Sequence, residues 1–342
     1  MEIYILFVFI IIALLFIDFK ANFKILRILA ILVIIAFSAF RYNVGYDYQT
    51  YEYIFSNNIK LEVGFNFIVN IFHLIGNNVK FVFAFFSIST ILFVVNGIRK
   101  HSINERMSLF LYIMIPGLFL SSLTTIRQSL AMAILFYGYN YYLKKKPIKF
   151  LIFAIIACLF HYSAGLVLVV IVLVHKIKMS SKFIWFILIS SLFIGSSGIL
   201  NKVLADIANG GYMNYFNDNV EANLFKLFVT NIFMMYILYY RNEIVEFRNI
   251  NVYYIKMIVV GTVILNLFST IPFVIRFGYY FKIYEIIVIP DFLYMKRKKA
   301  ITIMFMVFYI STFVYCLFID INGASSRGGL SNLIPYKTIF GN

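Results

Sequence analysis

The sequence predicts an all-helical protein that crosses a membrane about 12 times, with both termini outside. Three observations predict this fold class. Hydrophobic residues make up 63% of the 342 residues and charged residues only 13%, whereas soluble domains contain roughly 45–50% apolar and about 25% charged residues. The apolar residues fall in runs that approach the roughly 20 residues needed to span a bilayer. Basic residues cluster in the short segments between these runs.

The apolar runs are bounded by charges or by proline, glycine and asparagine. They are 3–17, 25–40, 81–98, 107–122, 126–142, 149–174, 183–199, 225–240, 252–270, 273–290 and 300–318. The first run has no basic segment before it, as a cleavable signal peptide would, so we expect it to be a retained span.

Two stretches do not fit one simple crossing each. Residues 64–76 are short and interrupted by polar side chains, and residues 149–174 are too long for one untilted span. The basic clusters decide both cases, because short cytoplasmic loops are rich in lysine and arginine. These clusters are Lys20 to Arg27, Arg99 to Arg106, Lys144 to Lys149, His175 to Lys182, Arg241 to Lys256, and Lys296 to Lys299. All six clusters lie on the cytoplasmic side of the membrane only if residues 64–76 do not cross it and the run 149–174 breaks at residues 161–165.

This topology predicts a single integral membrane domain over residues 1–342. Three segments are then expected outside. Residues 41–80 form a loop with a re-entrant or interfacial helix, residues 200–224 form a second loop, and residues 320–342 form a tail.

Several classes of function are excluded. There is no glycine-rich nucleotide-binding motif and no room for a bulky soluble catalytic domain. The net charge of +16 follows from the basic loops, so nucleic acid is not expected as a partner. We expect no metal site, because the four histidines lie in separate contexts. Cys158 and Cys316 each lie alone in an apolar run and are expected to be inert thiols.

Charged side chains outside the basic loops converge on the predicted outer face. Arg41 and Asp47 follow the second run, and Arg127 begins the run 126–142. His161 lies at the expected break, and Arg276 begins the run 273–290. Ionisable groups at membrane depth are costly, so these five residues are candidates for a functional site.

The segment from Arg41 to Tyr51 is the most distinctive stretch in the chain. Gly45 indicates a backbone bend, and Asp47 is placed to cap a short helix that carries Tyr51. One interpretation is structural: Arg41 extends to the interface at the end of its span, and Asp47 only caps the helix. The other is an arginine that holds an anion beside a carboxylate and sugar-stacking tyrosines.

Two arginines lie near predicted helix N-termini. Arg127, followed by Gln128, opposes the dipole of its helix, and an anion such as a diphosphate would resolve this conflict. Arg276 repeats the arrangement after Pro272 and is followed by Tyr280. The sequence therefore predicts anion binding at both positions.

His161 lies in the middle of the apolar run 149–174. A structural interpretation is a hydrogen bond from the imidazole to a neighbouring backbone carbonyl at the break. A functional interpretation is a general base or a phosphate donor, because imidazole titrates near neutral pH.

Five short stretches occur in a characteristic order along nearly the whole chain. They are Arg41-Tyr42-Asn43-Val44-Gly45-Tyr46-Asp47 with Tyr51, Glu62-Val63-Gly64, Arg127-Gln128-Ser129-Leu130-Ala131, Phe160-His161-Tyr162-Ser163-Ala164, and Pro335-Tyr336. This ordered combination resembles the EpsG family of polysaccharide polymerases, which is akin to the Wzy O-antigen polymerases.

The resemblance implies a multi-pass protein of the bacterial cytoplasmic membrane with an all-helical, GT-C-like fold and an active site on the outer face. It implies a metal-independent glycosyltransferase that extends a capsule, exopolysaccharide or O-antigen chain. The growing glycan would move from undecaprenyl diphosphate onto the next lipid-linked repeat unit. No cofactor is implied, and a chain-length regulator and a flippase of the same pathway are implied as partners.

This chemistry assigns roles to the candidate residues. The catalytic residues are expected to be His161, Asp47 and Arg127, with either His161 or Asp47 as the base. The residues expected to bind the diphosphate or the sugars are Arg41, Gly45, Tyr51, Arg127, Gln128, Arg276 and Tyr280. Three other functions fit the same pattern less well: an O-antigen ligase, a membrane acyltransferase, and a flippase of lipid-linked oligosaccharides.

Overall fold

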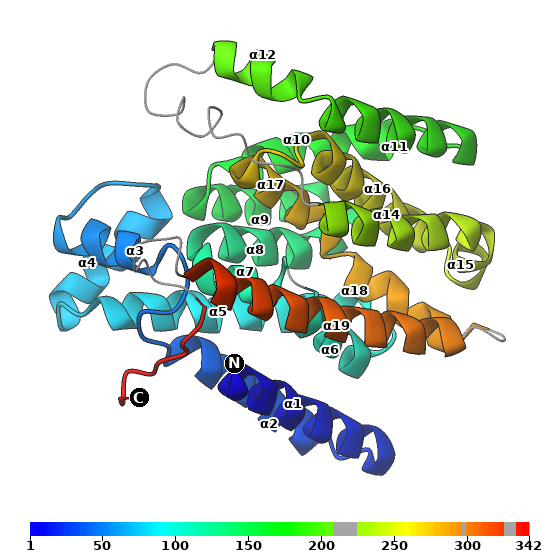
Figure 1. Cartoon of the computed structure of the whole chain (residues 1–342). Coiled ribbons are helices and arrows are strands. Elements are labelled where there is room, and N and C mark those ends of the chain that lie inside the picture. The colour runs from blue at the N-terminus through cyan, green and yellow to red at the C-terminus, as the bar shows by residue number, and fades with distance from the viewer. Residues whose placement is uncertain (116, 208–223, 296–298, 325–332, 342) are drawn as a thin grey trace. The chain divides into compact units, whose positions relative to one another are not determined.

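The computed structural model describes residues 1–115, 117–207, 224–295, 299–324 and 333–341 (Figure 1). Over these ranges the chain is almost wholly helical, and no strand is longer than an isolated bridge. The chain divides into two compact units: unit 1 comprises Met1–Leu166 and Ala300–Asn342, and unit 2 comprises Val167–Lys299. The predicted all-α class is confirmed.

Unit 1 contains the first nine helices, the start of the tenth and nearly all of the last. They are α1 (Glu2–Ala21), α2 (Lys24–Ala39), α3 (Tyr48–Ser56), α4 (Val63–Ile75), α5 (Val79–His101), α6 (Glu105–Met114), α7 (Phe119–Thr124), α8 (Ile126–Leu143), α9 (Pro147–Phe160), α10 (Ser163–Lys176) and α19 (Lys299–Ala324). Several begin with recognisable signals. Asn78 and Asn104 accept hydrogen bonds from first-turn amides of α5 and α6, and Pro147 begins α9.

The centre of unit 1 is α8, which packs between α5 and α9 (Figure 1). Two glycines allow these close approaches. A Cβ at Gly97 of α5 would lie 2.4 Å from the ring of Phe136, and one at Gly138 would lie 2.7 Å from Phe153 of α9. Most side chains of α8 are buried as a result, and this fixes the position of the N-terminus of α8, where the site lies.

The predicted runs agree with the helices except at two places, 107–122 and 273–290. The long run 149–174 breaks as expected, because α9 ends at Phe160 and His161 is extended, with φ −158° and ψ 118°. The run 107–122 was predicted as one span, but it is interrupted after Met114, between α6 and α7. The run 273–290 is divided into three short helices. Each of these two runs therefore contains more than one helix, since local turns interrupt stretches that are continuous in hydropathy.

Unit 2 contains the end of α10 and the remaining described helices. They are α11 (Ser181–Ser196), α12 (Ile199–Ile207), α14 (Leu224–Tyr239), α15 (Arg241–Phe247), α16 (Asn251–Leu267), α17 (Pro272–Lys282), α18 (Glu285–Val288) and the 3₁₀ helix η2 (Ile289–Leu293). The predicted loop 200–224 thus contains part of α12, and its residues 208–223 lie outside the described ranges. In this unit α16 packs against α11, α14 and α17.

The membrane character of the chain rests on its apolar helices. Among the described residues, three helical segments are long and apolar enough to cross a membrane: α1, α5, and Thr302–Asp320 of α19. Several other apolar helices have 10–17 residues, and at 1.5 Å per residue these fall short of a core about 30 Å thick. The chain is an all-α membrane protein, and the number of passes stays a prediction.

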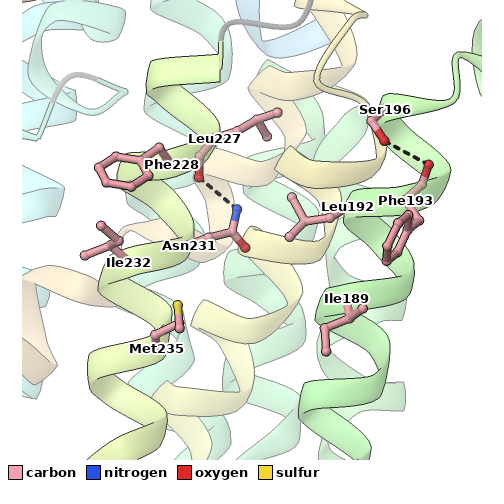
Figure 2. Close-up of a pocket in the computed structure, with 9 residues that line it drawn as sticks. All are labelled: Ile189, Leu192, Phe193, Ser196, Leu227, Phe228, Asn231, Ile232 and Met235. Atoms are coloured by element: carbon pink, nitrogen blue, oxygen red, sulfur yellow. Dashed lines mark hydrogen bonds between the residues drawn. The ribbon is translucent and has the colours of Figure 1, made fainter.

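A hollow of about 490 Å³ lies in unit 2, between α11 and α14. Figure 2 shows the side chains that line it. Its lining is apolar apart from Ser196 and Asn231. Asn231 donates hydrogen bonds to the Leu227 carbonyl and to Oδ1 of Asn266, each at 2.8 Å. None of the described residues that line this hollow is ionisable.

Candidate functional site

The predicted bend between α2 and α3 is present and packs against the turn that precedes α8. Gly45 has a φ of +106°, a conformation that residues with a side chain rarely adopt. A Cβ at Gly45 would lie 2.3 Å from the Leu123 carbonyl oxygen, so only glycine fits. The Arg41–Asp47 turn is therefore held against the end of α7, shortly before Arg127.

Arg41 is buried in this turn, with an exposed fraction of 1%. Its guanidinium donates to the backbone carbonyls of Ser38 and Val44 and to the Ser87 hydroxyl, and it lies 5.2 Å from the centre of the Phe83 ring. The Arg41 guanidinium is therefore enclosed by the chain and does not extend to solvent. Its contacts hold the turn, and burial lowers its pKa to about 10, so it stays protonated at neutral pH.

Asp47 is the N-cap residue of α3, as predicted, but its side chain makes no capping hydrogen bond. Its carbonyl accepts from the amide of Tyr51, one turn later. Tyr51 is buried. Burial raises the pKa of the Tyr51 hydroxyl, and the positive charge of Arg127 acts in the opposite direction. Tyr51 thus lies beside Arg127, the second residue of α8.

A second close approach brings Glu62 into the same region. Glu62 is the N-cap residue of α4. Two residues later, a Cβ at Gly64 would lie 2.8 Å from the Leu159 carbonyl oxygen. The start of α4 is thus packed directly on the last turn of α9, the helix that ends immediately before His161.

Arg127 is the second residue of α8 and forms an ion pair with the Glu62 carboxylate. Its Nε donates to the Tyr51 hydroxyl at 3.4 Å, and its guanidinium carbon lies 5.6 Å from the ring centres of Tyr51 and Phe65. The sequence predicts an anion at this helix N-terminus, and Glu62 supplies one within the chain. No described residue accepts a hydrogen bond from Nη2 of Arg127.

His161 lies in the extended link between α9 and α10, and its Nδ1 is 2.9 Å from Oε1 of Glu62. A carboxylate has no proton to donate, so Nδ1 carries the hydrogen. In the neutral ring, Nε2 then has a free lone pair. The imidazole side chain is 28% exposed and the Glu62 side chain 5%. The partner of His161 is therefore a distant carboxylate and not a neighbouring backbone carbonyl.

The single carboxylate of Glu62 thus joins two of the predicted catalytic residues. Burial alone would raise the pKa of Glu62, but the hydrogen bond from His161 and the charge of Arg127 outweigh it and hold the pKa below its usual value. Glu62 is ionised at neutral pH, and the pair it forms with Arg127 carries no net charge.

We call Tyr51, Glu62, Arg127 and His161 the carboxylate cluster. Glu62 is not among the site residues predicted from the sequence, although Glu62-Val63-Gly64 is one of the five stretches that carry the family resemblance. The only sequence signal was an isolated carboxylate two residues before a glycine. The partners of Glu62 are 65 and 99 residues away, so their contact cannot be read from local spacing.

The other predicted site residues are distributed as follows. Gln128 follows Arg127 in α8 and is half-buried. Arg276 and Tyr280 lie on α17 of unit 2, where Arg276 is half-buried and Tyr280 is buried. Arg276 is in the second turn of α17, which begins at Pro272. The cluster in unit 1 therefore assembles without these two residues.

The carboxylate cluster has the parts needed for acid–base chemistry. An imidazole fixed by a carboxylate through Nδ1 can take a proton at Nε2, as in the triads of hydrolases. A guanidinium beside it can stabilise negative charge on a leaving group. Among the described residues, no group of three or more His, Cys, Asp or Glu side chains is placed to hold a metal ion.

Comparison with known proteins gives one match. A family model described as the EpsG family matches residues 24–338, which is nearly the whole chain. No curated protein and no solved structure matches the chain. The matched range includes every member of the carboxylate cluster and most of the described tail.

Proposed function

We propose that this chain, which belongs to the EpsG family, polymerises a bacterial surface polysaccharide from lipid-linked repeat units. The family supports a polysaccharide-polymerase activity, that is, a glycosyltransferase-like reaction. We further propose the identity of the glycan donor and the side of the membrane on which the reaction takes place. The growing glycan leaves undecaprenyl diphosphate and joins the next repeat unit at the outer face of the cytoplasmic membrane, in a protein of about 12 passes.

The observation that carries this proposal is the bridge made by Glu62 between His161 and Arg127. In the reaction, a hydroxyl oxygen of the acceptor repeat unit forms a bond to the anomeric carbon of the growing glycan. The bond from that carbon to the diphosphate oxygen breaks, and the electron pair stays on the diphosphate. The hydroxyl proton must go to a base, and the new negative charge needs a cation.

We assign the base to Nε2 of His161. Glu62 fixes the imidazole tautomer with Nδ1 protonated and stabilises the imidazolium that forms when Nε2 takes the proton. Glu62 is thus a positioning residue for His161. Asp47 is the alternative base, because it precedes Tyr51 by one turn and its charge acts on the Tyr51 hydroxyl.

We assign the diphosphate contact to Arg127. The positive charge of Arg127 is balanced by the Glu62 carboxylate. Without substrate, the site therefore attracts anions only weakly. The Nη2 group of Arg127, which no described residue uses, can donate to a phosphate oxygen while Nη1 keeps Glu62. Charge on the leaving diphosphate is then stabilised where it develops, which is the arrangement that accelerates such a step.

The remaining predicted residues keep more modest roles in the proposal. Arg41 and Gly45 shape the turn that faces the site, and Tyr51 and Gln128 lie next to Arg127 to contact the glycan. Arg276 and Tyr280 of unit 2 stay proposed contacts for the diphosphate or the sugars. A chain-length regulator and a flippase of the same pathway are the proposed protein partners.

The test is a reaction with purified protein in lipid vesicles and lipid-diphosphate-linked repeat units, without nucleotide. Glycan length is read on a gel for the wild type, His161→Gln and Arg127→Ala. We expect a ladder from the wild type alone. Transfer of finished glycan to a different acceptor would indicate a ligase instead. Movement of the repeat unit to the opposite leaflet without elongation would indicate a flippase.

A further inference from the structure

The described C-terminal tail, residues 333–341, is joined to the Arg41–Asp47 turn through its backbone. The amide of Tyr42 donates to the Lys337 carbonyl, and the amide of Ile339 donates to the Phe40 carbonyl, each at 2.9 Å. Arg41 and Thr338 form an antiparallel bridge. A segment almost 300 residues away in sequence thus pairs with the backbone of this turn.

Aromatic side chains hold the tail against α1 and α2. The Tyr336 ring stacks on Phe37 with 4.2 Å between ring centres, and its hydroxyl donates to the Phe37 carbonyl. The Tyr4 hydroxyl donates to the Leu333 carbonyl at 2.8 Å. Tyr336 is 8% exposed and Tyr4 is fully buried, so these contacts are part of the packed interior of unit 1.

Asp320, near the end of α19, connects the tail and the turn directly. Its Oδ1 accepts a hydrogen bond from the Tyr46 hydroxyl, and its Oδ2 accepts from the amide of Ile334 at 3.0 Å. The residue is 1% exposed. A buried carboxylate is costly unless it is hydrogen-bonded, so the position of Asp320 requires both the turn and the tail to be in place.

The turn held in this way adjoins the carboxylate cluster. Gly45, next to Tyr46, lies against the Leu123 carbonyl, and Tyr51, one turn after Asp47, contacts Arg127. A shift of the turn would move Asp47 and Tyr51 relative to Arg127. Loss of the contacts of Asp320 or of the tail would therefore be expected to alter the geometry of the proposed site.

We propose that residues 333–341 and Asp320 form a strap that positions the Arg41–Asp47 turn for binding of the lipid-linked glycan. Asp320 is the positioning residue of this strap and acts through Tyr46. The role in glycan binding rests on the proposed function, whereas the role in holding the turn does not. We therefore design a test with one measurement that needs no activity.

The first measurement is thiol labelling of a cysteine introduced at Val44, with Cys158 and Cys316 replaced by alanine. Val44 is fully buried in the turn, so Val44→Cys is protected while the strap holds. We expect Asp320→Asn and Tyr46→Phe each to increase the labelling rate about ten- to a hundredfold, as expected for loss of one hydrogen bond to a charged group. Ser311→Ala, on the exposed part of α19, is the matched control and should not change the rate.

The second measurement is the dependence of polymerisation on repeat-unit concentration in the Tyr46→Phe variant. A positioning role predicts a raised KM with a smaller change in kcat. Protection of Val44→Cys in both variants would overturn the strap, whatever the activity. Fast labelling with unchanged kinetics would overturn the role of the strap in glycan binding, because the strap would then only hold the turn. If the wild type makes no polymer, the proposed function fails, and the labelling alone decides whether the strap exists.

Discussion

Oε1 of Glu62 lies 2.9 Å from Nδ1 of His161, although 99 residues separate them in the sequence. The same carboxylate is paired through Oε2 with Arg127. Three helix ends therefore meet at one buried acid: the start of α4, the start of α8 and the end of α9. Because Glu62 and Arg127 are paired with each other, neither leaves an uncompensated buried charge, which would be strongly destabilising.

The variant Glu62→Gln should lose most polymerisation while the protein stays folded and inserted. The amide can still occupy the space, but it carries no charge to stabilise the imidazolium or to balance Arg127. We expect a decrease of roughly a hundred- to a thousandfold in rate, within the range for general-base catalysis. The gel assay measures it. Glu52→Gln, on the neighbouring helix α3, is the control, and equal activity of the two variants would remove Glu62 from the mechanism.

The stability that Glu62 contributes should depend on pH. The pKa of Glu62 is lowered in the folded protein, so its contribution is fully present above the ordinary glutamate value of about 4.3 and is lost as the pH falls through the lowered value. Thermal unfolding in detergent should show the wild type more stable than Glu62→Gln near neutral pH. This difference should be constant near neutral pH and should narrow only as the pH falls below about 4.3. A difference that grows on acidification would contradict the ion pair.

Gly64 and Gly165 should respond differently to substitution by alanine, because only Gly64 lies close to a neighbouring backbone. A Cβ at Gly64 would lie 2.8 Å from a backbone oxygen of Leu159, whereas a Cβ at Gly165 would lie at an ordinary 3.6 Å from Sγ of Cys158. Gly64→Ala should therefore destabilise unit 1 by about 1–3 kcal/mol and displace Glu62 from His161. Gly165→Ala should be nearly neutral. Unfolding temperature and polymer yield of the two variants provide the measurement.

Parts of this architecture follow from the sequence by physical reasoning. The break at His161 is predictable because 26 apolar residues exceed one span, and the bend at Gly45 is predictable from glycine chemistry. Hydropathy alone does not indicate the interruption of run 107–122, although Pro116-Gly117 is a turn signal in the sequence. The burial of Arg41 and the partner of Arg127 depend on contacts between distant segments, which neither composition nor periodicity contains.

The choice between His161 and Asp47 as the base can be made with two isosteric variants. His161→Gln removes the only imidazole in the carboxylate cluster, so polymerisation should fall by roughly a hundred- to ten-thousandfold. Asp47→Asn keeps the N-cap position of α3, where the carboxylate makes no capping bond, so it should lower activity far less. If Asp47→Asn is the more damaging change, Asp47 is the base and His161 only holds Glu62.

The predicted topology can be tested with single cysteines in a variant that lacks Cys158 and Cys316. Asn57 and Lys145 are both exposed and lie in turns at the ends of α3 and α8. Because basic loops stay in the cytoplasm, a cysteine at Asn57 should react with a membrane-impermeant thiol reagent in intact cells. A cysteine at Lys145 should react only after permeabilisation. The opposite pattern would place the carboxylate cluster on the cytoplasmic side, where a lipid-linked substrate exported to the outer face could not reach it.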